Sequence, residues 1–430
     1  MQTVAIIGLG YVGLPLALQF ARTGTDTVGL DIDPAKVQAI RSGESYIAHI
    51  ASKDISEQVT SGRLQASTDF TELHRSSAII VCVPTPLNKY REPDLSYVIS
   101  TAEAIAPNLQ RGTLVVLEST TYPGTTEGEF RAALEQGSQL KAGVDFNLAF
   151  SPEREDPGNP QSELKIMPKL VGGLTPTCTE KTCALYQRVV RQVVPVSSCS
   201  VAEAAKLLEN IYRSVNIALV NELKVVYEAM GIDIWEVIAA AKTKPFGFMP
   251  FYPGPGLGGH CIPIDPFYLT WKAREFGQHT RFIELAGEIN TSMPQHVVNR
   301  TALALNAHKR AVNGSRILIL GLAYKANIDD QRESPSFALM DLLTRAGATV
   351  DYHDPHIPVI KPTREHAQWT NLRSINWDHT TISAYDIVII STAHAAVNYA
   401  QLSQWAQVIV DTRNAMASIP MTDRAKIWKA

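Results

Sequence analysis

The sequence predicts an α/β protein in which two Rossmann-like, doubly wound modules are joined by a central region of long helices. Short β-branched runs alternate with helically spaced segments over residues 1–200, and this alternation is typical of a parallel sheet covered on both faces. A long run from Val201 to about Ala241 contains no proline, and no glycine before Gly231. The alternation starts again after the AVNGS segment, so a second α/β module is expected to follow the helices.

The strands expected in the first module are apolar, β-branched runs bounded by turns or helical segments. They are Thr3–Ile7, Thr27–Leu30, Ala78–Val83, Thr113–Leu117 and Asn147–Phe150. Val201 to Ala241 is expected to form one nearly unbroken helix that connects domains or forms a dimer face. A second helical stretch should run from Pro266 to about Asn306.

In the second module, the segments RILILGLAYK, ATVDYHDP, YDIVIIST and QVIVDTR each contain a strand pattern. Ser334 and Pro335 suit the N-cap and first position of a helix over SPSFALMDLLTRAG. The chain of 430 residues is also too long for one ordinary core. We therefore expect three domains, over residues 1–200, 201–306 and 313–430.

Charge and cysteine content narrow the functional class. The 39 basic and 42 acidic residues nearly balance, which argues against a nucleic-acid-binding or membrane-surface protein. The N-terminal apolar run lacks the basic flank of a signal peptide and predicts a buried strand. Five scattered cysteines without a C-x-x-C pair argue against disulfides and against zinc. We expect a protein of a reducing, cytoplasmic compartment with no bound metal.

A cofactor site is predicted by VAIIGLGYVG, which places Gly8, Gly10 and Gly13 between a strand and a helix. Glycines at this spacing allow a tight turn, close approach of a pyrophosphate and packing of the helix on the sheet. Asp31 ends the second strand, where an acid binds the ribose hydroxyls and repels a 2′-phosphate, so NAD is expected rather than NADP. The alternative is a plain strand–turn–helix with Asp31 on the surface. Asp33 suits a helix N-cap, and Lys36 is either a cofactor contact or a solvated lysine.

The second module begins with GLAYKANIDDQRESP, which lacks the glycine pattern. Two nucleotide-type sheets with one cofactor fingerprint suggest that the second sheet holds another ligand. We expect a nucleotide-bearing substrate outside the carboxyl ends of its strands.

A thiol lies at the end of a glycine-rich loop, GPGLGGHCIPIDP, over residues 254–266. Single cysteines are most often small buried apolar residues; this is the expectation for the other four, Cys82, Cys178, Cys183 and Cys199. Cys261 differs because the glycines before it bring the backbone close to a ligand. His260 is not expected to pair with it, because adjacent side chains point apart on most backbones. A structural hydrogen bond is favoured over a substrate contact for this histidine.

Other polar residues suit an active site. Lys206 and Asn210 lie four apart on the long helix and share a face, although Lys206 could instead pair with Glu203 or Glu209. Glu153 follows the end of a strand, and Thr120 and Thr121 follow the end of another.

Seven ordered segments resemble the UDP-glucose/GDP-mannose dehydrogenase family across essentially the whole chain. They are GLGYVGLPLA, VPTPLN, ESTTYPGTT, FSPERED, AAKLLENIYRSVNIALVNEL, GPGLGGHCIPIDP and GLAYKANIDDQRESPS. The resemblance implies an NAD-binding N-terminal domain, a central helical dimer core and a C-terminal UDP-binding domain. It also implies a four-electron oxidation of a sugar-nucleotide primary alcohol to a uronic acid with two NAD+.

The resemblance implies a catalytic role for each of six residues. Cys261 would form a thiohemiacetal and then a thioester with the substrate. Lys206 and Asn210 would stabilise oxyanions. Asp265 would order the hydrolytic water or hold Lys206, while Glu153 would act as general base and Thr120 would position the water.

The remaining correspondences concern binding. Those implied for the cofactor are Gly8, Gly10, Tyr11, Val12, Gly13, Asp31, Lys36, Val83, Pro84, Thr85, Ser119, Thr121 and Arg332. Those implied for the substrate are Arg154, Tyr252, Gly254, Gly256, Leu257, Gly258, His260, Tyr324 and Lys325.

Within the family, His260 and Ile264 in GGHCIPIDP, together with PEREDPGNP, resemble the branch that oxidises UDP-N-acetylhexosamines. UDP-N-acetylglucosamine is the favoured substrate, and no motif separates it from the mannosamine and galactosamine epimers. TKPFGFMPFY, residues 243–252, is a candidate pocket for the acetamido group. Pro157 stands where some relatives have a cofactor-side glutamate, and no role is assigned to it.

Two other functions remain open from the sequence. One is a two-electron NAD dehydrogenase in which Cys261 is a bystander, and the other is a non-catalytic sugar-nucleotide sensor. The number of NADH formed per substrate molecule distinguishes all three. A cysteine hydrolase is weaker because no separate histidine is marked as its base.

Overall fold

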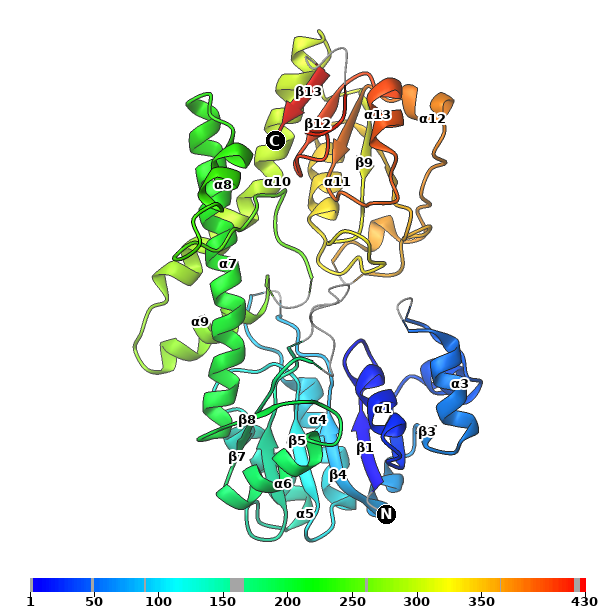
Figure 1. Ribbon diagram of the computed structural model, residues 1–430, viewed down its shortest axis with the longest axis vertical. Coiled ribbons are helices and arrows are strands. Elements are labelled where there is room, and N and C mark those ends of the chain that lie inside the picture. Colours follow the sequence, from blue (N-terminus) through cyan, green and yellow to red (C-terminus); the bar gives the residue numbers. More distant parts are fainter. Residues whose placement is uncertain are drawn as a thin grey trace. The chain divides into compact units, whose positions relative to one another are not determined.

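The computed structural model describes residues 3–47, 50–88, 90–154, 166–259, 262–363, 365–420 and 426–430 (Figure 1). The chain forms two compact units. Unit 1 is Met1–Glu209 with Phe267–His279, and unit 2 is Asn210–Pro266 with Thr280–Ala430. Each unit contains a Rossmann-like sheet with helices on both faces, which confirms the predicted fold class.

In the part of the chain that the structure describes, unit 1 has an eight-stranded sheet in the order β3-β2-β1-β4-β5-β6-β7-β8. The strands are β1 (Thr3–Ile7), β2 (Thr27–Leu30), β3 (Leu64–Ser67), β4 (Ser76–Val81), β5 (Leu114–Leu117), β6 (Asn147–Phe150), β7 (Lys169–Gly173) and β8 (Val193–Val196). All five predicted strands form within two residues of their expected ends.

The prediction of a wholly parallel sheet is wrong at one place, because β7 runs antiparallel to β6. The sequence patterns also missed β3, β7 and β8. β3 (LQAS) contains no β-branched residue, β7 ends in two glycines, and β8 contains Pro195. Glycine and proline weaken a strand pattern, and proline is tolerated in β8 because this strand lies at the sheet edge.

The two faces of this sheet are buried by different helices. α1 (Gly13–Arg22), α2 (Pro34–Arg41), α3 (Ser52–Thr60) and α6 (Pro176–Tyr186) contribute to one core, and α4 (Ser96–Ile105) and α5 (Arg131–Ser138) contribute to the other. Alternate residues of one strand enter opposite cores, as Val4 and Ala5 of β1 do. The near-continuous apolar strands in the sequence follow from this double coverage.

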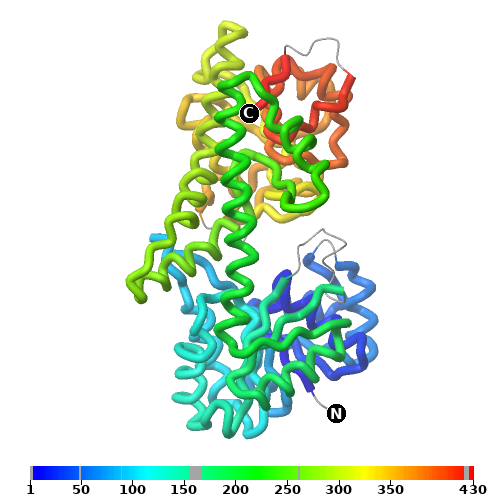
Figure 2. The backbone as a smooth tube through the Cα atoms, turned by 60° about the vertical axis from the view of Figure 1, so that its left-hand side comes forward, coloured from blue at the N-terminus to red at the C-terminus, as the bar shows by residue number. Residues whose placement is uncertain are grey.

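The central helices are more divided than predicted. α7 (Cys199–Ala229) is a single long helix (Figure 2), but the chain turns at Gly231, which has a φ of +73°, before α8 (Ile234–Ala241). The second stretch likewise divides at Gly277, with a φ of +67°, into α9 (Asp265–Glu275) and α10 (Arg281–Ala307). Both breaks fall at glycine, which adopts positive φ without the strain of a Cβ.

Unit 2 has a parallel five-stranded sheet among its described residues, in the order β10-β9-β11-β12-β13. Its strands are β9 (Arg316–Leu320), β10 (Thr349–His353), β11 (Ile387–Ile390), β12 (Ile409–Asp411) and β13 (Ile427–Lys429). α10 and α11 (Pro335–Arg345) cover one face, and α12 (His379–Ser383) and α13 (Tyr399–Trp405) cover the other. Ser334 caps α11 by accepting from the Ser336 N–H, as predicted.

Within the described ranges, no helix combines the length and the apolar character that a membrane span requires.

Candidate cofactor and substrate sites

The glycine turn after β1 has the geometry of a dinucleotide-binding loop. A Cβ on Gly8, whose φ is +91°, would lie 2.5 Å from the Cys82 carbonyl oxygen, and one on Gly13 would lie 1.9 Å from the Gly8 carbonyl oxygen. These two glycines are therefore needed for the turn and for close packing of α1. A Cβ on Gly10 would meet no atom within 4 Å. The open space at Gly10 is where a pyrophosphate approaches the backbone in this motif, so the loop fits NAD.

Asp31 lies where an acid contacts the adenosine ribose, directly after β2. Its carboxylate accepts from the Leu9 N–H at 2.8 Å, the Asp33 N–H at 2.9 Å and Lys36 Nζ at 3.1 Å. Asp31 is only 6% exposed, so the alternative that it is a surface residue is wrong. Asp33 caps α2 through the Ala35 N–H, as predicted.

The other predicted cofactor segments follow strands β4 and β5 at the same sheet edge. Val83, Pro84 and Thr85 follow β4, and Ser119 Oγ donates to the Val83 carbonyl oxygen at 2.8 Å. Thr121 is fully buried, with Oγ1 3.4 Å from a carboxylate oxygen of Glu203. Tyr11 and Val12 precede the first residue of α1.

Glu203 has partners that exclude it from the pairing considered for Lys206. Its carboxylate accepts from the Gly124 N–H at 2.6 Å and from the N–H and Oγ1 of Thr126 at 2.9 and 2.6 Å. Lys206 Nζ instead donates to the Glu153 carbonyl oxygen at 2.5 Å. Glu209, the second carboxylate considered for Lys206, pairs with Arg154 at 2.6 Å. The structure thus brings Lys206, Glu153 and Arg154 together in unit 1.

A buried lysine beside Glu153 was not predicted. Lys169 Nζ lies 3.2 Å from Glu153 Oε2 and 2.8 Å from Glu118 Oε2. Burial lowers the pKa of Lys169, but the negative charges of Glu118 and Glu153 outweigh burial and hold this pKa above its usual range. Glu118 directly follows β5 in the LEST segment, and its place after a predicted strand could have marked it as a candidate site residue. Lys169 could not be found in this way, because it is the first residue of β7, a strand that was not predicted.

In unit 2, Asn210 Nδ2 donates to Asp265 Oδ2 at 2.5 Å, and Arg213 donates to Asn210 Oδ1. Both Asn210 and Asp265 are buried. Two predicted site residues, His260 and Cys261, lie outside the described residues, as does Pro157.

The predicted substrate loop packs on the start of the second α/β module. Gly254 donates its N–H to Asn221 Oδ1 at 3.0 Å. A Cβ on Gly258 would lie 2.5 Å from Tyr324 Cβ, and the Gly259 N–H donates to the Arg332 carbonyl oxygen at 3.1 Å. The unit therefore groups the predicted residues Tyr252, Gly254, Gly256, Leu257, Gly258, Tyr324, Lys325 and Arg332 around one loop and one turn. Tyr252 itself stacks on Trp235 with ring centroids 5.7 Å apart, and Arg332 pairs with Asp330 at 2.6 Å.

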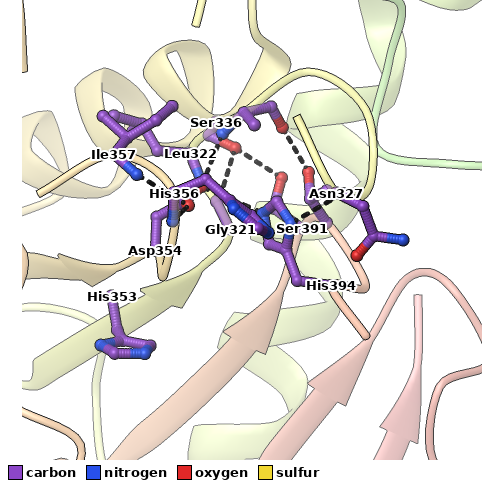
Figure 3. A network of polar contacts seen from close by, with 12 residues as sticks. Gly321, Leu322, Asn327, Ser336, His353, Asp354, His356, Ile357, Ser391 and His394 are labelled. Carbon is purple, nitrogen blue, oxygen red and sulfur yellow. Dashed lines mark hydrogen bonds and ion pairs between the residues drawn. The ribbon is translucent and has the colours of Figure 1, made fainter. Parts of the chain in front are cut away.

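A buried polar network holds the turn that carries Tyr324 and Lys325 (Figure 3). Asp354, directly after β10, accepts from the Leu322 N–H at 2.7 Å and from His394 Nε2 at 3.1 Å. The Asn327 N–H donates to His394 Nδ1 at 3.0 Å. In this arrangement Nδ1 of His394 is the acceptor and Nε2 is the donor to Asp354. The network was not predicted, since its members come from separate strand ends.

The four described cysteines are free, and Cys178 and Cys199 are buried. Burial raises the pKa of Cys82, Cys183 and Cys199, so these thiols stay protonated and weakly reactive. Within the described ranges, no group of three or more histidine, cysteine or acidic side chains could hold a metal ion.

The fold and these residues define the class. A Rossmann sheet with a pyrophosphate-binding glycine turn and a ribose-binding acid is a nicotinamide dinucleotide domain. Lysine and carboxylate side chains lie at the same carboxyl edge, where such domains bind the reacting group. The chain is an NAD-dependent dehydrogenase.

Comparison with known proteins specifies the family. Three models of the UDP-glucose/GDP-mannose dehydrogenase family match: the NAD binding domain over residues 2–190, the central domain over 200–292 and the UDP binding domain over 318–418. The chain belongs to the UDP-glucose/GDP-mannose dehydrogenase family, as the sequence motifs predicted.

Relatives extend over nearly the whole chain. UDP-N-acetyl-D-glucosamine 6-dehydrogenase of Pseudomonas aeruginosa is 34% identical over 95% of this chain and 96% of its own. NDP-N-acetyl-D-galactosaminuronic acid dehydrogenase of Ralstonia solanacearum is 35% identical over 96% of both chains. The structure of UDP-D-ManNAc dehydrogenase from Pyrococcus horikoshii has a TM-score of 0.89 and 32% identity, covering 100% of this chain and 99% of that one. The relatives share acetamido sugars but differ in the epimer, so identity alone does not select one.

Proposed function

We propose that this chain oxidises the C6 hydroxyl of a UDP-N-acetylhexosamine to the carboxylate, with UDP-N-acetylglucosamine as the favoured substrate. The observation that carries the proposal is similarity over almost the whole chain to relatives named for acetamido sugar nucleotides. The balanced reaction consumes one alcohol, one water and two NAD+, and it yields one carboxylate, two NADH and three protons.

Gly8, Gly10, Gly13 and Asp31 would hold the dinucleotide, with Val83 to Thr85 and Ser119 beside it. When bound there, NAD+ would supply the hydride acceptor for C6 in each of the two oxidations. Asp31 favours NAD over NADP because a 2′-phosphate would bring a second negative charge to its carboxylate. Lys36 pairs with Asp31 and offsets part of the negative charge of its carboxylate. The Asp31 carboxylate can still accept hydrogen bonds from both ribose hydroxyls.

Cys261 would link the two oxidations. Its thiolate attacks the aldehyde carbon to form a thiohemiacetal, which again carries a C–H bond beside an oxygen and can lose a second hydride. The resulting thioester is hydrolysed: water adds to the carbonyl carbon, the C–S bond breaks, and the thiolate is regenerated. A thiol suits these steps because it is more nucleophilic than a hydroxyl near neutral pH and forms a more readily hydrolysed ester.

The polar residues would stabilise charge and activate water. The Lys206 ammonium and the Asn210 amide would donate to the oxyanions, with Asp265 fixing the Asn210 amide through the hydrogen bond described above. Glu153 would take a proton from the hydrolytic water, and Thr120 would position that water.

The substrate would be held by the loop and turn of unit 2, with Lys325 as its cationic group there. Arg154 is a further proposed substrate contact, and Arg332 is a proposed cofactor contact. Residues 243–252 remain the proposed acetamido pocket. The proposal retains three functional domains at residues 1–200, 201–306 and 313–430, supported by the three matching family models.

The same proposal includes a homodimer in the cytoplasm. Tyr212, Leu219 and Val226 are exposed at intervals of seven residues along α7, so they form one apolar stripe that a second copy would cover. Free cysteines fit a reducing compartment. Light scattering should give a mass of twice the chain or a higher multiple.

The test is the NADH yield at completion with limiting UDP-N-acetylglucosamine, its mannosamine and galactosamine epimers, and UDP-glucose in separate wells. Two NADH per molecule from one acetamido sugar supports the proposal and names the substrate. One NADH per molecule favours the two-electron dehydrogenase with Cys261 as a bystander, and none from any sugar favours the sensor. In Cys261→Ser, acid formation should be lost while NAD affinity stays within about 2-fold, since Cys261 is not a cofactor contact. Full four-electron turnover in this variant would exclude the thioester.

A further inference from the structure

Three charged side chains form a buried cluster at the carboxyl edge of the unit 1 sheet. Lys169 Nζ lies 2.8 Å from Glu118 Oε2 and 3.2 Å from Glu153 Oε2. The side chains of Lys169, Glu118 and Glu153 are 4%, 0% and 14% exposed, respectively. Only Glu153 therefore reaches solvent, and the two groups behind it are almost completely buried.

The reversed strand β7 explains how Lys169 reaches this edge. Phe150, the last residue of β6, pairs with Gly172 of β7. Because the strands are antiparallel, Lys169 lies beyond the end of β6, where Glu153 follows. Ser151 Oγ donates to the Leu170 carbonyl oxygen at 2.7 Å and fixes the start of β7 at this position.

Tyr186 of α6 contacts both buried members of the cluster, Glu118 and Lys169. Its hydroxyl donates to Glu118 Oε1, and its ring centroid lies 5.2 Å from Lys169 Nζ. Burial and the charge of Glu118 raise the pKa of Tyr186, so this hydroxyl keeps its proton and remains a donor. Cys82 also lies near the charges of the cluster. Burial and the charge of Glu118 raise the pKa of the Cys82 thiol.

Stability alone does not account for this arrangement. Removing charges from water costs several kcal/mol for each ion, and apolar residues of similar volume are often equally stabilising or better. The cluster holds two carboxyl groups for one ammonium. Burial and the Glu153 charge raise the pKa of Glu118, although Lys169 and the Tyr186 hydroxyl offset part of this effect, and when both carboxyl groups are ionised the cluster has excess negative charge. The excess resides on the side chain that faces solvent, Glu153, which is the proposed general base.

We propose that Lys169 and Glu118 are positioning residues for the Glu153 carboxylate: Lys169 keeps it ionised and fixed in orientation, and Glu118, by sharing the ammonium, keeps it basic enough to accept a proton from the hydrolytic water. The inference rests on the proposed function of Glu153. In that step the water oxygen bonds to the thioester carbon, one water proton passes to Glu153 and the C–S bond breaks to release thiolate. Lys169 holds the Glu153 carboxylate in place through their ion pair. Glu118 also binds the Lys169 ammonium, so only part of that positive charge acts on Glu153.

The other groups around Glu153 support these separate roles for Lys169 and Glu118. The Arg154 N–H donates to Glu153 Oε1 at 2.7 Å, so each carboxylate oxygen has a fixed donor. The Arg154 guanidinium pairs with Glu209 at 2.6 Å, and Lys206 Nζ binds the Glu153 carbonyl rather than its carboxylate. Among the contacts of the described residues, Lys169 is an ammonium that binds the Glu153 carboxylate, and Glu118 is an acid that shares it.

Two substitutions should move the titration of Glu153 in opposite directions. In Lys169→Met, two carboxylates face each other without a cation, so the acid limb of the kcat–pH profile should rise by about one unit or more. In Glu118→Gln, the whole ammonium acts on Glu153, so the acid limb should move to lower pH by a similar amount.

Lys169→Met should also lower kcat about 10-fold to 100-fold at pH 7, with KM values within about 2-fold. Mass spectrometry should detect the acyl group retained on Cys261. Lys169→Arg should restore most of the wild-type profile because it keeps the charge.

Carbon-13 NMR of glutamate carboxyls in the full-length protein, with Glu153→Gln to assign the signal, follows this titration without turnover. Opposite shifts in Lys169→Met and Glu118→Gln support the control of Glu153 by its two buried neighbours, whereas an NADH yield of one per substrate molecule would overturn the hydrolytic step assigned to Glu153. Shifts that are absent or share one direction overturn the inference even in a fully active enzyme. Lys53→Met, which removes an exposed lysine 3.7 Å from Glu57, is the matched control and should change neither signal. Glu118→Gln is nearly isosteric, so it serves if Lys169→Met fails to fold.

Discussion

In unit 1, Gly8 follows β1 with a φ of +91°, and in unit 2, Gly321 follows β9 with a φ of +84°. The Gly8 N–H donates to the Leu30 carbonyl oxygen at 2.8 Å, and the Gly321 N–H donates to that of His353 at 2.9 Å. In both sheets, the chain thus leaves the first strand by the same turn and is tied to the end of the neighbouring strand.

The next residue extends the similarity. The Leu9 N–H donates to Asp31 at 2.8 Å, and the Leu322 N–H donates to Asp354 at 2.7 Å. Each aspartate directly follows the second strand of its module. The first glycine and the acid of the cofactor motif therefore belong to the strand–turn geometry of both modules, and neither one alone indicates a dinucleotide.

The modules differ at the second and third glycine positions, where GLGYVG stands in one and GLAYKA in the other. Gly10 faces open space, but Ala323 is fully buried and donates its N–H to Asp354 at 2.9 Å. Gly13 begins α1, whereas α11 begins much later at Pro335. The cofactor turn is therefore distinguished by a helix that starts directly after it and by a glycine that faces open space before that helix.

The largest expected effect follows substitution of the third glycine. In Gly13→Ala, the added Cβ would lie 1.9 Å from the Gly8 carbonyl oxygen, so α1 must move away from β1. Overpacking against backbone costs about 3 kcal/mol or more, and the midpoint of thermal unfolding should fall by roughly 6–12 °C. NAD binding should be lost as well. A variant with wild-type unfolding temperature would show that the turn is not as tight as described.

Substitution of the second glycine should separate binding from folding. Because a Cβ on Gly10 would meet no atom within 4 Å, Gly10→Ala should unfold within about 2 °C of wild type. Its NAD affinity should fall about 10-fold or more, since the methyl occupies the space for the pyrophosphate. Calorimetric titration with NAD measures this, and unchanged affinity would exclude the pyrophosphate from this turn. Ala323→Gly should leave NAD affinity unchanged.

A smaller effect is expected from pH at the equivalent acid of unit 2. Burial raises the pKa of Asp354, but hydrogen bonds from His394 and backbone N–H groups outweigh burial and lower this pKa to about 2. A depressed folded-state pKa stabilises the protein above the unfolded-state pKa of about 3.9, and this stability is lost as pH falls from about 4 to 2. The contribution at neutral pH is about 2 kcal/mol.

Urea unfolding followed by tryptophan fluorescence at pH 6, 4 and 3 measures this contribution. Asp354→Asn should be less stable than wild type at pH 6, and the difference should shrink as pH falls. Asp329→Asn, outside the network, should differ little from wild type at every pH. A constant difference between wild type and Asp354→Asn would mean that the network does not depend on the Asp354 charge.

Local patterns were sufficient to predict the double Rossmann architecture, the strands leading to the glycine turn, and the caps at Asp33 and Ser334. These features depend on residues a few positions apart. The buried cluster at Lys169 was missed because it joins residues that are 51 and 16 positions apart. It also depends on an antiparallel pairing that no local pattern indicates. The sequence could not decide the partner of Lys206 for the same reason. Glu203 and Glu209, three residues before and after Lys206, both bind groups that are distant in the sequence.

The reversal of β7 has a consequence for protein engineering. In a wholly parallel sheet, the first residue of a strand lies at the opposite edge from the last, about 13 Å away for a five-residue strand such as β7. A lysine placed at the start of such a strand could not reach Glu153. Grafting this carboxylate with its buried ammonium partner onto an ordinary nucleotide-binding domain would therefore require transplanting β7 in its reversed direction, together with its lysine.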